Sequence, residues 1–241
     1  MAKTEAPNTG NTLNTFTGFK PEAFKLLNAL AKNNNREWFL ENKTVYDQEL
    51  RAPMAALVET LALGFAARDI PLTGDAKKSL FRVNRDVRFS HNKEPYKTNV
   101  SAVLSRDGSK TAQGLLYLQL GGSEGAFVAS GFYAMEPPSL AAFRQAIANK
   151  PEKWLAVTAG LEQSGFALGS DDALKRMPKG FEHYQEEAIA SALKQKHFVI
   201  TQNFSKKSFE NPDIVIDIIK FAETARPLLD FGWKAIQGSV K

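Results

Sequence analysis

Positive charge is concentrated in one short segment of this sequence, LFRVNRDVRFSHNKEPYKTNVSAVL, which spans residues 80–104 and has the composition of a β-hairpin. Its basic side chains are Arg82, Arg85, Arg88, Lys93 and Lys97. The planar fork of arginine matches the geometry of a phosphate or carboxylate group, and lysine adds a compact positive charge. The segment therefore predicts a binding site for an anionic ligand.

A regular strand over residues 81–89 would place alternate side chains on opposite faces. One face would carry Phe81, Val83, Arg85, Val87 and Phe89, and the other Arg82, Asn84, Asp86, Arg88 and Ser90. Arg85 then lies on an apolar face, where a charged group needs a partner or a pocket, unless a bulge at Asn84 shifts the alternation. Asp86 lies between Arg82 and Arg88, which should depress the pKa of its carboxyl group.

The turn and the second half of the hairpin add further hydrogen-bonding side chains to the predicted ligand site, namely Lys93, Tyr96, Lys97 and Asn99. Two residues are predicted to move a proton if the site is catalytic. Asp86 is the carboxylate among the arginines, and His91 is in the turn beside them. The alternative is a solvated charged surface in which Asp86, Glu94 and helix carboxylates neutralise the arginines.

A second polar site is predicted on the helix over residues 36–50. A helical wheel places Trp38, Phe39, Val45, Tyr46 and Leu50 on the core side. Asn42 falls within that arc, with Arg36 and Lys43 at its edge. We expect this helix to pack near the hairpin, so that Arg36, Asn42 and Lys43 share a pocket with Arg82, Arg85, Arg88 and Lys97. The alternative is a structural network of satisfied polar groups, and a separation of Asn42 from Arg85 beyond ~15 Å would exclude the shared pocket.

The elements that position these residues predict an α+β fold, with a central antiparallel sheet, a meander of about four to six strands, flanked by N- and C-terminal helices. Helices are expected to begin at Pro21, Asn35, Pro53, Pro137, Pro151 and Pro212. Strands are expected over residues 82–90, 96–104, 115–120, 126–133 and 197–204. Residues 1–15 are polar and predict a disordered tail, and residues 16–241 a single domain.

Composition excludes several classes of function for a chain of 241 residues with a net charge of +5. The sequence has no cysteine, which rules out a disulfide framework, a thiolate zinc site and a cysteine nucleophile. His91, His183 and His197 are not spaced as a ligand pair, so no metal site is predicted, and no motif indicates a cofactor. No apolar run suggests a membrane span, and a cytoplasmic location is predicted.

Four segments carry a family resemblance: NNNREWFLENKTVY, LFRVNRDVRFSHNKEPYKTN, LKRMPKGF and ARPLLDF. In this order they resemble the signatures of a bacterial and fungal family known as domain of unknown function 2461. The resemblance covers nearly the whole chain from Phe16 onward. It implies a single domain with the arginine hairpin as the family's hallmark, and it implies no established activity and no catalytic residue.

The predicted function is the binding of a small molecule that carries a phosphate or carboxylate group. If the protein is an enzyme, phosphoryl or ester chemistry is expected, with Arg82, Arg85 and Arg88 stabilising negative charge. One alternative is nucleic-acid binding, in which Trp38, Phe89 and Tyr96 would stack on bases. The other is a structural charge network with no ligand. The sequence leaves the oligomeric state open.

Overall fold

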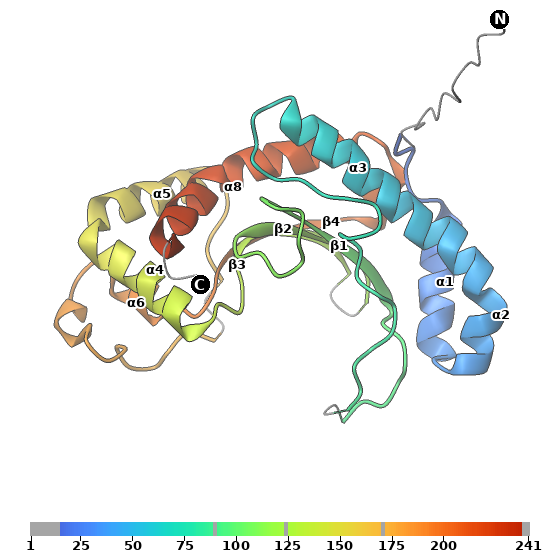
Figure 1. The fold of residues 1–241 in the computed structure, drawn as a ribbon, viewed down its shortest axis with the longest axis horizontal. Coiled ribbons are helices and arrows are strands. Elements are labelled where there is room, and N and C mark those ends of the chain that lie inside the picture. The colour runs from blue at the N-terminus through green and yellow to red at the C-terminus, as the bar shows by residue number, and fades with distance from the viewer. Residues whose placement is uncertain (1–14, 89–90, 123–124, 170–171, 238–241) are drawn as a thin grey trace, which may run out of the picture.

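A four-stranded antiparallel sheet lies at the centre of the protein, whose computed structural model describes residues 15–88, 91–122, 125–169 and 172–237. Its strands are β1 (Asn99–Ser105), β2 (Leu115–Gly121), β3 (Ala126–Phe132) and β4 (Phe198–Phe204). They lie in the order β1-β2-β3-β4, so each strand pairs with the next one along the chain (Figure 1). This arrangement confirms the predicted α+β meander. The predicted tail lies outside the described residues apart from Thr15.

The helices that precede the sheet are α1 (Pro21–Lys32), α2 (Arg36–Tyr46) and α3 (Ala52–Ala66), with a π-helical turn (Asp47–Arg51) between the last two. Helix α1 begins at Pro21 as predicted. Asn35 caps α2, because its side-chain oxygen accepts a hydrogen bond of 3.0 Å from the Trp38 N–H. Helix α3 begins one residue before Pro53, since the π-helical turn continues α2 into α3 without a break.

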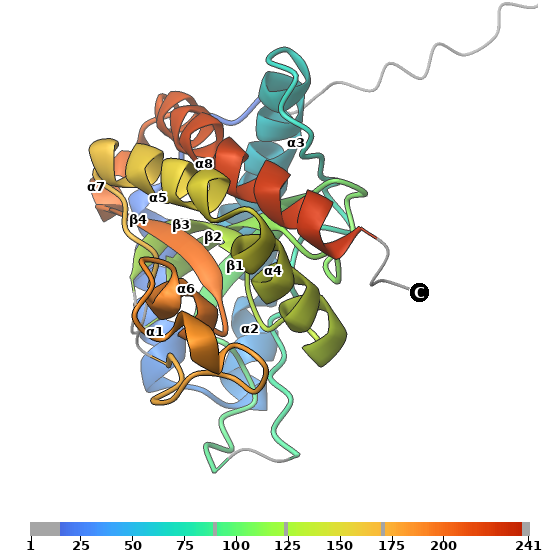
Figure 2. The ribbon, with the colours of Figure 1, turned by 90° about the vertical axis from the view of Figure 1, so that its left-hand side faces the viewer.

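The helices in the second half of the chain are α4 (Pro137–Asn149), α5 (Pro151–Gln163), α6 (Ala190–Lys194), α7 (Lys206–Glu210) and α8 (Ile214–Ile236), with a 3-10 turn (Glu182–Tyr184) before α6. Figure 2 shows α5 and α8 side by side, with α6 on the other side of β4. The segment 174–181 forms no helix or strand, as predicted for LKRMPKGF. Among the described residues, no helix combines the length and apolarity that a membrane span requires.

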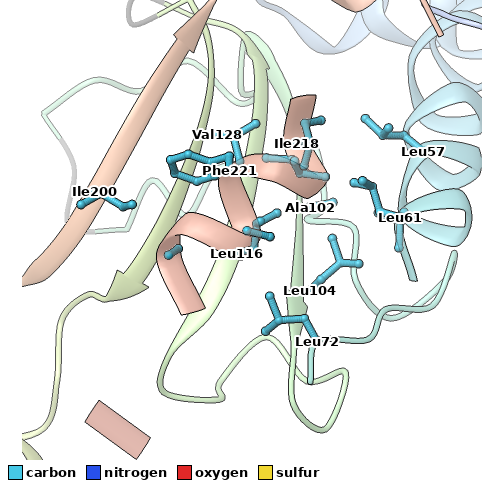
Figure 3. Packing of buried hydrophobic residues seen from close by; sticks show 14 of the residues in the cluster. Leu57, Leu61, Leu72, Ala102, Leu104, Leu116, Val128, Ile200, Ile218 and Phe221 are labelled. Carbon is cyan, nitrogen blue, oxygen red and sulfur yellow. The ribbon is translucent and has the colours of Figure 1, made fainter. Parts of the chain in front are cut away.

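Helices α3 and α8 cover one face of the sheet and form the main core with it (Figures 1 and 3). The strands turn alternate apolar residues toward these helices, and Ala102, Leu116 and Ile200 are fully buried there. Leu61 from α3 and Ile218 from α8 pack against this layer. The contact is close. A Cβ atom on Gly232 of α8 would lie 2.2 Å from the Phe132 ring, so this position requires glycine.

The opposite face of the sheet carries no helix across it among the described residues (Figure 1). Helices α1 and α2 lie beyond one end of the strands, and α4 and α6 lie beyond the other. Residues 81–88 and 91–98, which we name the basic arm, project from the sheet on the side away from α3 and α8 (Figure 1). The uncovered face and the arm therefore meet along β1.

The basic arm is not the regular strand that the sequence predicts for residues 82–90. Its described part, 82–88, is joined to the return segment by an isolated bridge between Asn84 and Tyr96, and β1 begins only at Asn99. A two-stranded ribbon that projects beyond its sheet has no third strand to pair with, and such ribbons are only marginally stable. The alternation of side chains is nevertheless kept, since Arg82, Asn84, Asp86 and Arg88 are exposed and Phe81, Val83, Arg85 and Val87 are half-buried. Phe89 and Ser90 lie outside the described residues.

One core prediction for α2 is also wrong. Phe39 and Tyr46 are buried as predicted, and so is Leu50 in the following turn, but Val45 is 41% exposed. At about 100° per residue, Val45 lies roughly 100° around the helix from Tyr46, outside the narrower arc that the core covers. Asn42 lies near the border of that arc and is half-buried.

Candidate functional site

The candidate site lies where the basic arm joins the uncovered face of the sheet. Two backbone hydrogen bonds fix this junction, from the Phe81 N–H to the Ser101 carbonyl (2.9 Å) and from the Val103 N–H to the Ser79 carbonyl (3.1 Å). Leu80 is buried in the core, so Phe81, the next residue, points to the uncovered face. Its ring lies 6.0 Å from the ring of Tyr117 on β2.

Cations gather around the Phe81 ring. The Nζ atoms of Lys97 and Lys110 lie 5.2 Å and 5.5 Å from the ring centroid, within the range of cation–π attraction. Lys110 comes from the loop between β1 and β2 and is held by a 2.7 Å hydrogen bond to the Leu80 carbonyl. Arg82, the residue after Phe81, is exposed beside them. We name Phe81, Arg82, Lys97 and Lys110 the Phe81 cluster.

The positive charge of the Phe81 cluster is only partly balanced within the described residues, because Arg82 interacts with the Asp86 carboxylate at a distance. Burial lowers the pKa of Lys97, and the positive charges of Arg82 and Lys110 lower it further. Among the residues that the structure describes, no carboxylate forms an ion pair with Arg82, Lys97 or Lys110. An anion bound here would therefore relieve a repulsion that the protein maintains without it.

Two further aromatic rings continue from the Phe81 cluster across the sheet. Tyr117 on β2 and Phe127 on β3 have ring centroids 5.8 Å apart and are both half-buried. The Tyr117 hydroxyl donates a 2.9 Å hydrogen bond to Oε1 of Gln119, which also accepts one of 3.2 Å from Asn99 Nδ2. Phe81, Tyr117 and Phe127 form what we name the aromatic row, which is separate from the main core on the helix-covered face.

At the outer part of the arm, in contrast, the cations are paired. Arg88 donates two hydrogen bonds to the Asp86 carboxylate, of 2.9 Å and 2.7 Å. Arg85 lies 3.5 Å from Glu94, and this ion pair compensates the guanidinium charge on the more apolar side of the arm. Lys93 donates to the Val87 carbonyl at 3.0 Å.

The two predicted proton-transfer residues lie in this outer part. The hydrogen bonds from Arg88 lower the pKa of Asp86, and the charge of Arg82 lowers it further. Asp86 is therefore anionic at neutral pH and is suited to an ion pair rather than to proton donation. His91 is exposed in the turn. Their catalytic roles stay predictions.

Helix α2 and the arm do lie together, but other residues join them. Asn34, just before α2, accepts a 3.0 Å hydrogen bond from the Tyr96 N–H and donates one of 2.9 Å to the Tyr96 carbonyl. The Tyr96 ring is 6% exposed and stacks on Phe39 of α2, with centroids 4.1 Å apart. Tyr96 thus anchors the arm to α2, and its ring is not open to stack on a nucleic-acid base.

The polar residues predicted on α2 interact locally. Asn42 donates to the Trp38 carbonyl of its own helix at 2.8 Å, and Lys43 pairs with Asp47 one turn further on. Arg36 is exposed at the start of α2. A pocket that these residues share with Arg85 stays a prediction.

Several residues of the site were not among the predicted site residues, namely Phe81, Gln119, Asn34, Lys110 and, on β2 and β3, the aromatic residues Tyr117 and Phe127. The two aromatic residues could have been found, because each stands between residues that face the core, in LLYLQL and AFV, and alternation places it on the opposite face. Asn34 and Lys110 carry no such signal, since their partners Tyr96 and Leu80 lie 62 and 30 residues away.

Two surface pockets lie elsewhere in the structure. One is between α1 and the turn that joins β2 to β3, where Leu27, Asn28 and Gly122 contribute to its lining. The other lies along α5 and α8, beside Lys153 and Phe231. Neither the predicted ligand-binding residues nor the Phe81 cluster lines either pocket, so the cluster is distinct from both. Within the described ranges, no group of three or more histidine and acidic residues could hold a metal ion.

Comparison with known families matches residues 22–231 to the model of a family described as conserved hypothetical proteins, domain of unknown function 2461. The chain belongs to this family. The match spans α1 to most of α8 and confirms the resemblance carried by the four sequence segments, without testing a bacterial or fungal origin. No curated protein and no solved structure matches the chain. Family membership therefore leaves the function to be argued from the site.

Proposed function

We propose that this protein binds a small molecule bearing a phosphate or carboxylate group, and that the anionic group lies against the Phe81 cluster. The observation that carries the proposal is the convergence of Lys97 and Lys110 on one ring, beside Arg82, with none of the three in a close ion pair among the described residues. Like charges held together at a partly buried position favour an opposite charge between them.

Only some of the basic residues predicted from the sequence belong to the proposed binding site. Arg82 and Lys97 are retained as ligand residues, and Asn99 donates to Gln119, which accepts the hydrogen bond of the Tyr117 hydroxyl. Arg85 and Arg88 are assigned to ion pairs within the arm, as in the alternative of a structural charge network. The proposed activity is binding, and phosphoryl or ester chemistry by Asp86 or His91 would need a ligand that reaches from the base of the arm to its outer part.

The experiment is a calorimetric titration with inorganic pyrophosphate at low and moderate salt. The variant Lys97→Met should weaken pyrophosphate affinity at least about ten-fold, equivalent to ~1.4 kcal/mol, because it removes a charge-assisted contact. The matched control is Lys93→Met, which makes the same change of charge in the outer arm and should alter affinity by less than about two-fold.

Two outcomes would overturn the proposal. The first is that the native protein does not bind pyrophosphate at all. The second is that Lys97→Met and Lys93→Met weaken binding equally, which would attribute the effect to net charge rather than to the Phe81 cluster.

A further inference from the structure

The aromatic row extends the cation cluster in one direction only, across the sheet. Phe81 lies alongside β1, Tyr117 is on β2 and Phe127 is on β3, with successive centroids 6.0 Å and 5.8 Å apart. The cations lie at the Phe81 end of the row. A ligand whose anionic group contacts these cations therefore has flat aromatic surface beside it, toward β3.

The rings are held in place before any ligand arrives. The register pairs Tyr117 with Ala129 and Gln119 with Phe127, so the small Ala129 side chain leaves room beside Tyr117 on the same face. The hydrogen bond from the Tyr117 hydroxyl to Gln119 fixes the direction of that ring. Rings whose orientation is fixed lose little conformational freedom when another ring stacks on them.

The aromatic row lies outside the main core. The main core on the helix-covered face contains none of the three rings, which are half-buried on the face that no described helix covers. Partly exposed aromatic side chains on an uncovered sheet face are a known platform for nucleobases, since every base has a flat π surface.

We infer that the ligand is a nucleotide, with its phosphate groups against Arg82, Lys97 and Lys110 and its base over Tyr117 and Phe127. This inference rests on the proposed function and specifies the class of its ligand. The cations form a compact group around one ring, which fits a mononucleotide better than the extended backbone of a nucleic acid. Gln119, the cross-strand neighbour of Phe127, and Asn99 on β1 contribute amide groups beside the row.

The test compares ADP with inorganic pyrophosphate, because both carry a diphosphate and only ADP carries a base. ADP should bind at least about five-fold more tightly, the lower limit for one base stacked on an aromatic ring. Phe127→Leu should abolish this preference and leave pyrophosphate affinity unchanged, which also shows that the variant is folded. Tyr117→Leu provides a second variant in the same row.

The control is Tyr133→Leu, which removes a ring that is 71% exposed and stacks on His197, away from the aromatic row. The preference for ADP should persist in this variant. Equal affinity of the native protein for ADP and pyrophosphate would overturn the inference, and so would a preference for ADP that persists in Phe127→Leu. Either result would leave the proposed anion site intact. Failure of both compounds to bind would refute the proposed function itself. Binding of a single-stranded oligonucleotide more than about ten-fold tighter than ADP would replace the mononucleotide with a polynucleotide.

Discussion

The two ends of the basic arm contain similar residues in opposite electrostatic situations. In the outer part, Arg88 is paired with Asp86 and Arg85 with Glu94. At the base, Lys97 shares the Phe81 ring with Lys110, and its pKa is lowered by burial and further by its positive neighbours. The comparison shows that a count of cations does not locate an anion site. The relevant quantity is the charge that remains after the protein has paired its own groups.

The two ends also differ in how firmly they are attached. The base is held by the Asn34 hydrogen bonds and by the stacking of Tyr96 on Phe39. The outer part rests on contacts within the arm, such as Lys93 with the Val87 carbonyl. Binding residues need a fixed framework, and the base supplies one.

The largest expected effect comes from detaching the base. Asn34→Ala removes both partners of the Tyr96 backbone and should lower the free energy of unfolding by about 1–3 kcal/mol, because partly buried polar groups are left unpaired. It should also weaken pyrophosphate binding, since Lys97 follows Tyr96 directly. Urea unfolding and titration measure the two effects.

The neighbouring Asn33→Ala is the control for this prediction. Asn33 is exposed and its side chain donates to the Ala29 carbonyl in the last turns of α1. Its replacement should therefore change the free energy of unfolding by no more than about 0.5 kcal/mol. Equal stability of the two variants would show that Asn34 does not anchor the arm.

A smaller effect on stability is expected for Lys97→Met, and it is an increase rather than the usual loss. Because its pKa is lower in the folded protein than the ordinary 10.5, folding disfavours its charged form. The unfolded chain binds more protons between the lowered pKa and 10.5, so the native protein gains stability as pH rises through that interval. Lys97→Met should lack this gain and should melt at a slightly higher temperature than the native protein at neutral pH.

Lys93→Met again serves as the control, and its melting temperature should be unchanged or slightly lowered. Loss of stability in Lys97→Met would mean that the lysine is held by favourable contacts rather than by a site prepared for an anion. Thermal unfolding at neutral and alkaline pH measures both variants.

The smallest effect is expected at the outer ion pair. The folded pKa of Asp86 is below its ordinary 3.8, so its contribution to stability is present above 3.8 and is lost as pH falls through the folded value. Asp86→Asn should therefore be slightly less stable than the native protein at neutral pH and equal to it in strong acid. A pyrophosphate affinity reduced as strongly by Asp86→Asn as by Lys97→Met would erase the distinction between the two ends of the arm.

Local rules were sufficient to predict much of the fold. Pro21 and Asn35 mark helix starts because fixed backbone angles and end capping act within a few residues. Strands β2, β3 and β4 fall within a residue or two of their predicted bounds, and alternation along the arm is preserved even where no regular strand forms. Helix starts, strand bounds and alternation depend on residues that are close together along the chain, so they can be predicted from the sequence.

The sequence by itself thus determined the α+β class, the starts of α1, α2, α4 and α5, and the presence of a concentrated basic segment, whereas α8 begins at Ile214, two residues after the predicted Pro212. The tertiary structure decided which of those charges remain unpaired, since it alone brings Lys110 to Phe81 and Asn34 to Tyr96. Such pairings join residues that are far apart along the chain, and their energies depend on burial and distance rather than on residue type. For the same reason Val45, which helical spacing assigned to the core, is exposed at its margin.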